Sequence, residues 1–150
     1  MVNFAYSDGP RLLAEGGLDL RESGADLRVL LVMELSTAGS QPSAVFVSDI
    51  TTLDEHNGAN YARQSLSAQA VMKNGAPDYD TKLTAANVVF PNLGVGSRKC
   101  RGAIVYVHSG ADSANRLLYW IGHSGFPFDA NGLNATIAWN TAGVSRLKPA

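Results

Sequence analysis

Cysteine is nearly absent from the sequence, since Cys100 is the only one among 150 residues. A single cysteine excludes an intrachain disulfide framework and a structural zinc site built from several cysteines. Charge of either sign is also modest, with 12 lysines and arginines against 13 aspartates and glutamates, and neither sign clusters. We therefore expect no nucleic-acid partner, because such a partner requires a concentrated basic surface.

Long apolar runs are missing as well. None approaches the roughly 18–20 residues that a helix needs to span a bilayer. The first four residues contain no basic segment followed by an apolar one, which is the pattern of an export signal. We expect a protein without a membrane anchor or an export signal of its own.

The chain is nevertheless long and apolar enough to fold as one domain. Hydrophobic residues make up 45% of it, and a chain of this size buries about 68–70% of the surface that it exposes when unfolded. We predict a single β-rich domain over residues 1–150, with an N-terminal arm at 1–9 and a short C-terminal tail at 148–150.

Glycine and proline, with 15 and 6 residues, are spread along the chain and separate short apolar runs. This punctuation is typical of β-rich folds. We predict an all-β domain, a two-layer β-sandwich or jelly-roll-like fold with one or two short helices. The helices are expected at residues 10–15 and 46–53, and the strands at 27–33, 61–72, 86–90, 103–108, 117–121 and 133–139.

Two of these strands have a clear alternation of side chains. Leu66, Ala68, Ala70 and Met72 alternate with polar residues, which predicts that these four face the core. The strand at 133–139 alternates in the same way and ends in Trp139. The strand at 27–33 is apolar on both faces beyond Arg28, which predicts burial between two packed layers.

The histidines and the cysteine match no motif that supports chemistry. His56, His108 and His123 are scattered and fit no metal-binding spacing. Cys100 has no recognisable partner in the sequence. His108 and His123 both end predicted strands, so these two histidines would lie close together if the two strand ends are neighbours.

Other candidate motifs are incomplete. Ser124 lacks the glycine pattern of a hydrolase elbow, and Asp78 and Asp80 lack the rest of a calcium loop. The glycines at 94 and 96 precede a predicted strand, whereas a phosphate-binding loop precedes a helix. We predict a protein that is not an enzyme, with no catalytic residue, no metal and no cofactor.

Aromatic residues are concentrated in the last third of the chain. Tyr119 and Trp120 lie in the middle of a predicted strand, which favours a place in the core. Phe126 and Phe128 lie in a predicted loop, where exposed rings would anchor a partner. A stacking platform for sugar rings, formed by the aromatic residues between 120 and 128, is the alternative.

Several short segments occur together in a distinctive order from residue 12 to residue 147. They are Leu-Leu-Ala-Glu-Gly-Gly-Leu-Asp-Leu at 12–20, Asp-Leu-Arg-Val-Leu-Leu at 26–31, Val-Ser-Asp-Ile at 47–50, Asn-Tyr-Ala-Arg at 60–63, the run 83–92, Arg-Gly-Ala-Ile-Val-Tyr at 101–106 and the run 139–147. In their order and spacing, the chain resembles a family of small virion proteins of tailed bacteriophages. Some members are similar to capsid cement, or decoration, proteins.

The resemblance implies a β-rich module that binds the outer surface of the phage head. Such a protein would clamp adjacent subunits of the major capsid protein and stabilise their lattice. It implies a virion protein made in the host cytoplasm, and a homo-oligomer, with a trimer expected ahead of a dimer. A tail- or fibre-associated carbohydrate-binding or structural module is the alternative, and a small hydrolase is a third reading.

Three groups of residues are the predicted contacts with the capsid partner. The N-terminal segment offers aromatic anchors and has too few residues for strand pairing of its own. The second group is a small basic loop, and the third is the aromatic loop near residue 127. The predicted partner-binding residues are Asn3, Phe4 and Tyr6, then Arg98, Lys99 and Arg101, and finally Phe126 and Phe128.

Overall fold

The chain folds into antiparallel β-sheets with one α-helix and two 3₁₀ helices, which confirms the predicted all-β class. The structure is a computed structural model that describes all residues except 1–2, 22, 74–80, 123–124, 140–143 and 148–150. In chain order, the elements are β1 (Phe4–Ala5), α1 (Asp8–Ala14), β2 (Leu27–Met33), η1 (Ala38–Ser40), η2 (Val47–Asp49), β3 (Gln64–Ser65), β4 (Ala70–Lys73), β5 (Thr81–Thr84), β6 (Val88–Phe90), β7 (Cys100–Val107), β8 (Arg116–Ile121), β9 (Ala135–Ile137) and β10 (Ser145–Leu147).

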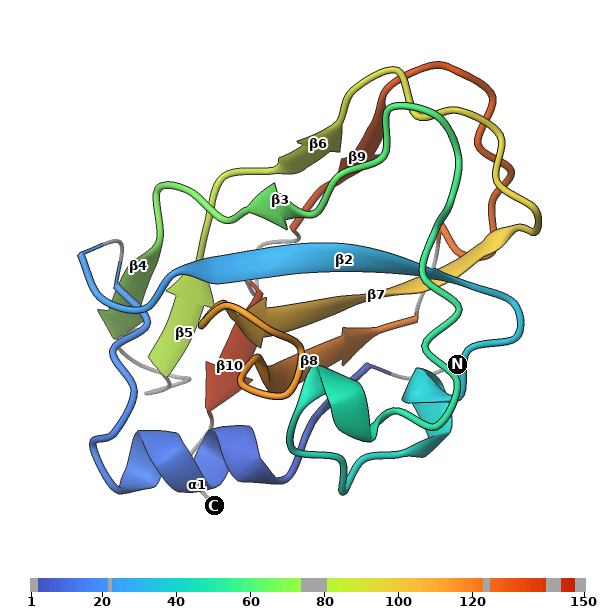
Figure 1. Cartoon of the computed structure of the whole chain (residues 1–150). Coiled ribbons are helices and arrows are strands. Elements are labelled where there is room, and N and C mark those ends of the chain that lie inside the picture. The colour runs from blue at the N-terminus through green and yellow to red at the C-terminus, as the bar shows by residue number, and fades with distance from the viewer. Residues whose placement is uncertain (1–2, 22, 74–80, 123–124, 140–143, 148–150) are drawn as a thin grey trace.

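A five-stranded sheet with the order β1-β8-β7-β2-β3 forms the centre of the molecule (Figure 1). Its long strands β2, β7 and β8 are neighbours, and β7 pairs with both of the others. The second strand layer is divided into a three-stranded sheet, β10-β5-β4, and a two-stranded sheet, β6-β9. In Figure 1, β6 and β9 lie at the top of the molecule and α1 lies at the bottom.

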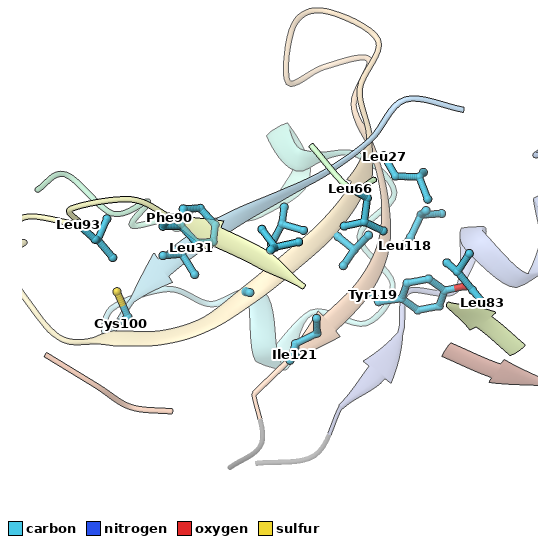
Figure 2. Close-up of a cluster of buried hydrophobic side chains, with 14 of the residues drawn as sticks. Leu27, Leu31, Leu66, Leu83, Phe90, Leu93, Cys100, Leu118, Tyr119 and Ile121 are labelled. Atoms are coloured by element: carbon cyan, nitrogen blue, oxygen red, sulfur yellow. The ribbon is translucent and has the colours of Figure 1, made fainter. Parts of the chain in front are cut away.

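The larger core lies between the central sheet and the two small sheets. Leu31, Val105 and Ile121 from the central sheet pack there with Leu83 from β5 and Phe90 from β6. Figure 2 shows these buried side chains between the layers, with Phe90 toward one end of the cluster and Leu83 toward the other. This packing of strand layers, face to face, is the predicted sandwich arrangement.

The opposite face of the central sheet is covered by the segment 38–53, which contains both 3₁₀ helices. Ile104 and Trp120 on the sheet contact Ala38, Val47 and Ile50 in this covering segment. Both faces of the sheet are therefore buried. This explains why β2 is apolar on both faces, and its bounds are those predicted from the sequence.

A β-bulge in β8 alters which side chains reach the larger core. Tyr119 is paired with Val105, whereas the next pair along joins Leu117 to Tyr106, so Leu118 is the extra residue. As a result Leu118 and Tyr119 both face the larger core, although they are consecutive. A bulge inserts one unpaired residue in this way and shifts the alternation beyond it.

The two predicted helices have different outcomes. The helix expected at 10–15 exists as α1 and ends where Gly16 adopts a φ of +71°, a conformation that glycine tolerates. The helix expected at 46–53 is only the short η2. The chain beyond it runs alongside the end of β2, where the Met33 N–H donates to Asp54 O at 2.7 Å.

The prediction of one continuous strand at 61–72 is wrong. The chain forms β3, leaves the central sheet, and then joins the three-stranded sheet as β4. Between them Ala68 has a φ of +52°. Before this break Leu66 is buried as predicted, whereas beyond it Gln69 is buried and Met72 is 49% exposed, contrary to the prediction.

The remaining strand predictions hold in position and differ in length. β6, β7, β8 and β9 lie within or around the predicted segments, and β9 covers only Ala135–Ile137 of the segment expected at 133–139. The strands β1, β5 and β10 were not predicted. Each has four residues or fewer, which is too short for a visible alternation.

Adjacent residues of β9 provide a test of which face is buried. Ile137 is half-buried and packs against the larger core, whereas its neighbour Thr136 is exposed. We expect Ile137→Asp to lower the free energy of unfolding by about 2 kcal/mol or more, because it places a charge against apolar side chains. Thr136→Asp should change it by no more than about 0.5 kcal/mol. The urea unfolding midpoints of the two variants, compared at equal m-value, measure both changes. Equal losses of stability in the two variants would contradict the assignment of Ile137 to the buried face.

Candidate partner-binding surface

The N-terminal segment is part of the fold and not a free arm. Phe4 and Ala5 pair as β1 with Trp120 and Tyr119 of β8, so the expectation that this segment lacks strand pairing is wrong. Tyr6 is completely buried, and its hydroxyl donates a hydrogen bond to Ala38 O at 3.1 Å. Burial raises the pKa of the Tyr6 phenol. Two residues suffice for pairing here because β8 already presents a rigid edge to them.

The side chains of this segment consequently have intramolecular roles. Asn3 is exposed, but its Oδ1 accepts a hydrogen bond from the Gly122 N–H at 2.9 Å. Phe4 is half-buried and packs edge-on against Tyr6, with ring centroids 5.1 Å apart. Of the three predicted contact residues, only Asn3 is exposed, whereas Phe4 is half-buried and Tyr6 is buried.

The predicted basic loop does not form a free positive patch. The Arg98 guanidinium pairs with Asp54, which also accepts the Leu35 N–H at 2.8 Å. This pairing lowers the pKa of Asp54. Arg101 donates to the Ser36 carbonyl oxygen at 3.0 Å. Arg98, and Arg101 at the start of β7, therefore donate hydrogen bonds to carboxylate and carbonyl oxygens of neighbouring loops within the chain.

Lys99 is the most accessible cation of that loop. Its ammonium lies 3.2 Å from a carboxylate oxygen of Asp129, and both side chains are largely exposed. An exposed pair of this kind contributes about 0–1 kcal/mol. Little free energy is therefore needed for Lys99 to leave Asp129 and pair with another acidic group.

The aromatic loop is held in place by backbone pairing with β7. Cys100 donates its N–H to Phe128 O at 2.9 Å, and Phe128 donates its N–H to Cys100 O at 3.0 Å. The rings of Phe126 and Phe128 are half-buried, with centroids 5.6 Å apart and planes tilted by 40°. The structure therefore brings the two predicted residues together as a fixed pair of rings.

These two rings form one wall of a pocket of about 600 Å³ at the open end of the larger core. The pocket lies between the central sheet and the β6-β9 sheet. Its lining consists of Leu31, Phe90, Ile121, Gly125, Phe126, Phe128, Ala135, Thr136, Ile137, Ala138 and Trp139. None of these residues carries a charge, and the volume is within the range of about 300–1,000 Å³ that is common for binding sites.

Two of the aromatic residues considered for a sugar-stacking platform, Tyr119 and Trp120, do not line the pocket. Trp120 is completely buried and Tyr119 is 9% exposed, because both belong to β8 of the central sheet. Trp139 is half-buried, and its Nε1 donates to Ala86 O at 2.9 Å. Tyr119 and Trp120 therefore belong to the core, whereas Trp139 lines the pocket, and Thr136 is the one lining side chain with a hydroxyl.

Cys100 has a partner that the sequence did not reveal. Its Sγ lies 3.3 Å from His56 Nδ1, and His56 Nε2 lies 3.0 Å from the Gly94 carbonyl oxygen. Because a carbonyl oxygen only accepts, Nε2–H donates to Gly94 O, and Nδ1 accepts a hydrogen bond from the Cys100 S–H. Both residues are buried, and burial raises the pKa of Cys100 to about 11. The thiol therefore stays neutral at physiological pH, which is unlike an activated nucleophile.

The other candidate chemical groups lie partly outside the described residues. His123 and Ser124, and Asp78 with Asp80, belong to segments that the structure does not describe. His108 is half-buried, and its backbone N–H donates to Asp26 O at 2.8 Å. Among the described residues, no group of three or more histidine, cysteine, aspartate and glutamate side chains is placed to hold a metal ion.

Sequence reasoning found two walls of the pocket but not its floor. Leu31, Phe90 and Ile121 were assigned to buried strands, and burial alone does not distinguish a core position from a pocket floor. The alternation at 133–139 identified the inward side chains of β9, and it is the one sequence pattern that pointed to these pocket residues. The gap between β9 and the central sheet depends on long-range packing.

Comparisons with known proteins give no relative: no protein-family model, curated protein or solved structure matches the chain. Within the described part of the chain, no helix has the length and apolar character required to cross a membrane.

Proposed function

We propose that the protein is a virion structural protein of the capsid cement type. In this role it binds the outer surface of a tailed-phage head, contacts the major capsid protein and stabilises its lattice. The observation that carries the proposal is the uncharged, aromatic-walled pocket behind Phe126 and Phe128. Buried apolar anchors of this kind dominate the free energy of protein–protein binding.

The order of short segments along the whole chain supports the same role. In the proposal the protein acts by binding and not by catalysis, as a homo-oligomer, with a trimer ahead of a dimer. Cys100 and His56, the residues that most resemble a nucleophile and a base, are both buried, which is consistent with a structural role for them. Lys99 beside the aromatic loop supplies a polar rim for an acidic residue of the capsid.

Binding to an assembled shell stabilises the shell by mass action. One site contributes about 2.7 kcal/mol when free protein is a hundredfold above its dissociation constant. Heads stripped of the protein should therefore release DNA at a lower temperature than heads to which it has been returned. A fluorescent DNA dye added during heating measures this difference.

Two variants make this test specific to the candidate surface. Phe126→Ala removes a wall of the pocket and should reduce both rebinding and thermal protection. Val95→Ser changes a side chain that is 74% exposed and does not line the pocket, so it should protect as the wild type does. If wild-type protein does not rebind, or stripped heads retain DNA to the same temperature, a tail or fibre role becomes the better account.

A further inference from the structure

The strand β9 has one edge that no described strand covers. It pairs with β6 on its other side, and these two strands form a sheet of their own. A two-stranded sheet is marginal by itself, and an uncovered edge presents unpaired N–H and C=O groups. These groups are complementary to the backbone of another extended segment.

The direction of the backbone groups identifies Thr136 as the residue that faces this open edge. The Trp139 N–H points toward the β6 side of the sheet, because it donates to Oδ1 of Asn87, the residue before β6, at 3.3 Å. Because N–H direction alternates along an extended strand, the N–H groups of Ala135 and Ile137 also face β6. The N–H and C=O of Thr136 then face away from β6.

The pocket is lined by the same stretch of chain. Five consecutive residues, Ala135 to Trp139, line it. Side chains of an extended strand alternate between two faces, so a pocket on one face would be lined by every second residue. Contact with five residues in succession indicates that the pocket reaches the backbone of this segment and not only the side chains of one face.

Taken together with the cement role proposed above, on which this inference rests, we propose that an extended segment of the capsid subunit adds to the edge of β9 as a third strand. Its backbone pairs with Thr136, and one of its apolar side chains enters the pocket between Phe90 and the rings of Phe126 and Phe128. Backbone pairing provides affinity in strand addition, and a pocket for a side chain provides specificity. The uncharged lining selects an uncharged side chain.

The unpaired backbone favours a peptide segment over a small apolar molecule or a glycan. A small apolar molecule would fill the pocket and leave the edge of β9 unpaired. A glycan would require several polar side chains, whereas Thr136 is the only hydroxyl-bearing residue in the lining. Only an extended peptide satisfies the edge and the pocket at once.

The test compares two substitutions at one exposed position. Thr136→Pro removes the outward N–H, and Thr136→Val keeps it while replacing the hydroxyl. We expect the proline variant to bind stripped heads at least tenfold more weakly than the valine variant in a co-sedimentation titration. Urea unfolding of both variants checks that the fold is retained. Hydrogen exchange of the wild-type protein, free and on heads, adds a measurement without substitution, in which the Thr136 amide should become protected.

The outcomes separate this inference from the proposed function. If wild-type protein binds heads but the Thr136 amide stays unprotected, strand addition is wrong and the cement role stands. Equal binding by the two folded variants has the same meaning. If the wild type does not bind heads at all, the cement role and its proposed occupant both fail. If the amide is protected in the free oligomer, with loss of the oligomer in Thr136→Pro, the occupant is a second copy and the inference is overturned.

Discussion

Replacing Gly102 with valine is expected to destabilise the protein by about 3 kcal/mol or more, because β7 has no room for a side chain there. A Cβ atom at this position would lie 2.3 Å from Cη2 of Trp120 and 2.8 Å from the Ile121 carbonyl oxygen. Trp120 is completely buried, so its indole has no free space into which to move. Urea unfolding, followed by tryptophan fluorescence, measures the loss.

Gly17→Ala is the matched control for this substitution. The nearest atom to a Cβ at Gly17 is Leu12 Cδ2, at an ordinary contact distance of 3.6 Å. We expect the alanine variant to differ from the wild type by no more than about 0.5 kcal/mol, or to be slightly more stable. If the Gly102 variant unfolds at the same urea concentration as this control, the packing of the indole against β7 is wrong.

Replacing Asp8 with asparagine is expected to cost about 2 kcal/mol at neutral pH. Asp8 begins α1, and its nearly buried carboxylate pairs with Arg11 on the same helix and with Arg116 on β8. The carboxylate therefore joins the helix to the central sheet. Asparagine retains the size of the side chain but leaves two guanidinium groups without their shared counter-charge.

The pH dependence of this effect has a definite sign. Burial raises the pKa of Asp8, but hydrogen bonds and charge from Arg11 and then Arg116 outweigh it, so that the net pKa is lowered. A group with a lowered folded-state pKa stabilises the fold above its unfolded pKa, about 3.9 for aspartate, and loses that contribution as pH falls through the folded value. The difference between wild type and Asp8→Asn should therefore shrink below about pH 4.

Asp129→Asn provides the control for the Asp8 experiment. Asp129 is 69% exposed and pairs only with the exposed Lys99 among the described ion pairs. Its substitution should change the stability by no more than about 0.5 kcal/mol. A pH-independent difference between wild type and Asp8→Asn would contradict the assigned role of the buried carboxylate.

Local sequence was sufficient for elements whose environment is uniform. Beyond Arg28, β2 lies between two packed layers, so its apolar residues on both faces identified the strand. α1 was predicted because Pro10 suits the first turn of a helix and Gly16 suits its end. In both cases the neighbours in sequence determine the conformation, and tertiary contacts reinforce it.

Elements that change their environment were not predictable in the same way. The alternation from 61 to 72 was read as one strand, but the chain moves between two sheets at Ala68. Periodicity records which face of a strand is apolar and contains no information about the sheet to which it belongs. The two-residue strand β1 likewise exists only because β8 offers it an edge.

The same distinction between local sequence and tertiary contacts applies to the candidate site. The sequence by itself determined the β-rich class, the two-faced burial of β2 and the presence of aromatic rings at 126 and 128. Only the tertiary structure placed those rings beside the edge of β9, paired Arg98 with Asp54, and brought Cys100 to His56 across 44 residues of sequence. The reason is physical: local propensity acts over a few residues, whereas a pocket, an ion pair or an open strand edge is defined by contacts between distant segments that exist only in the folded chain.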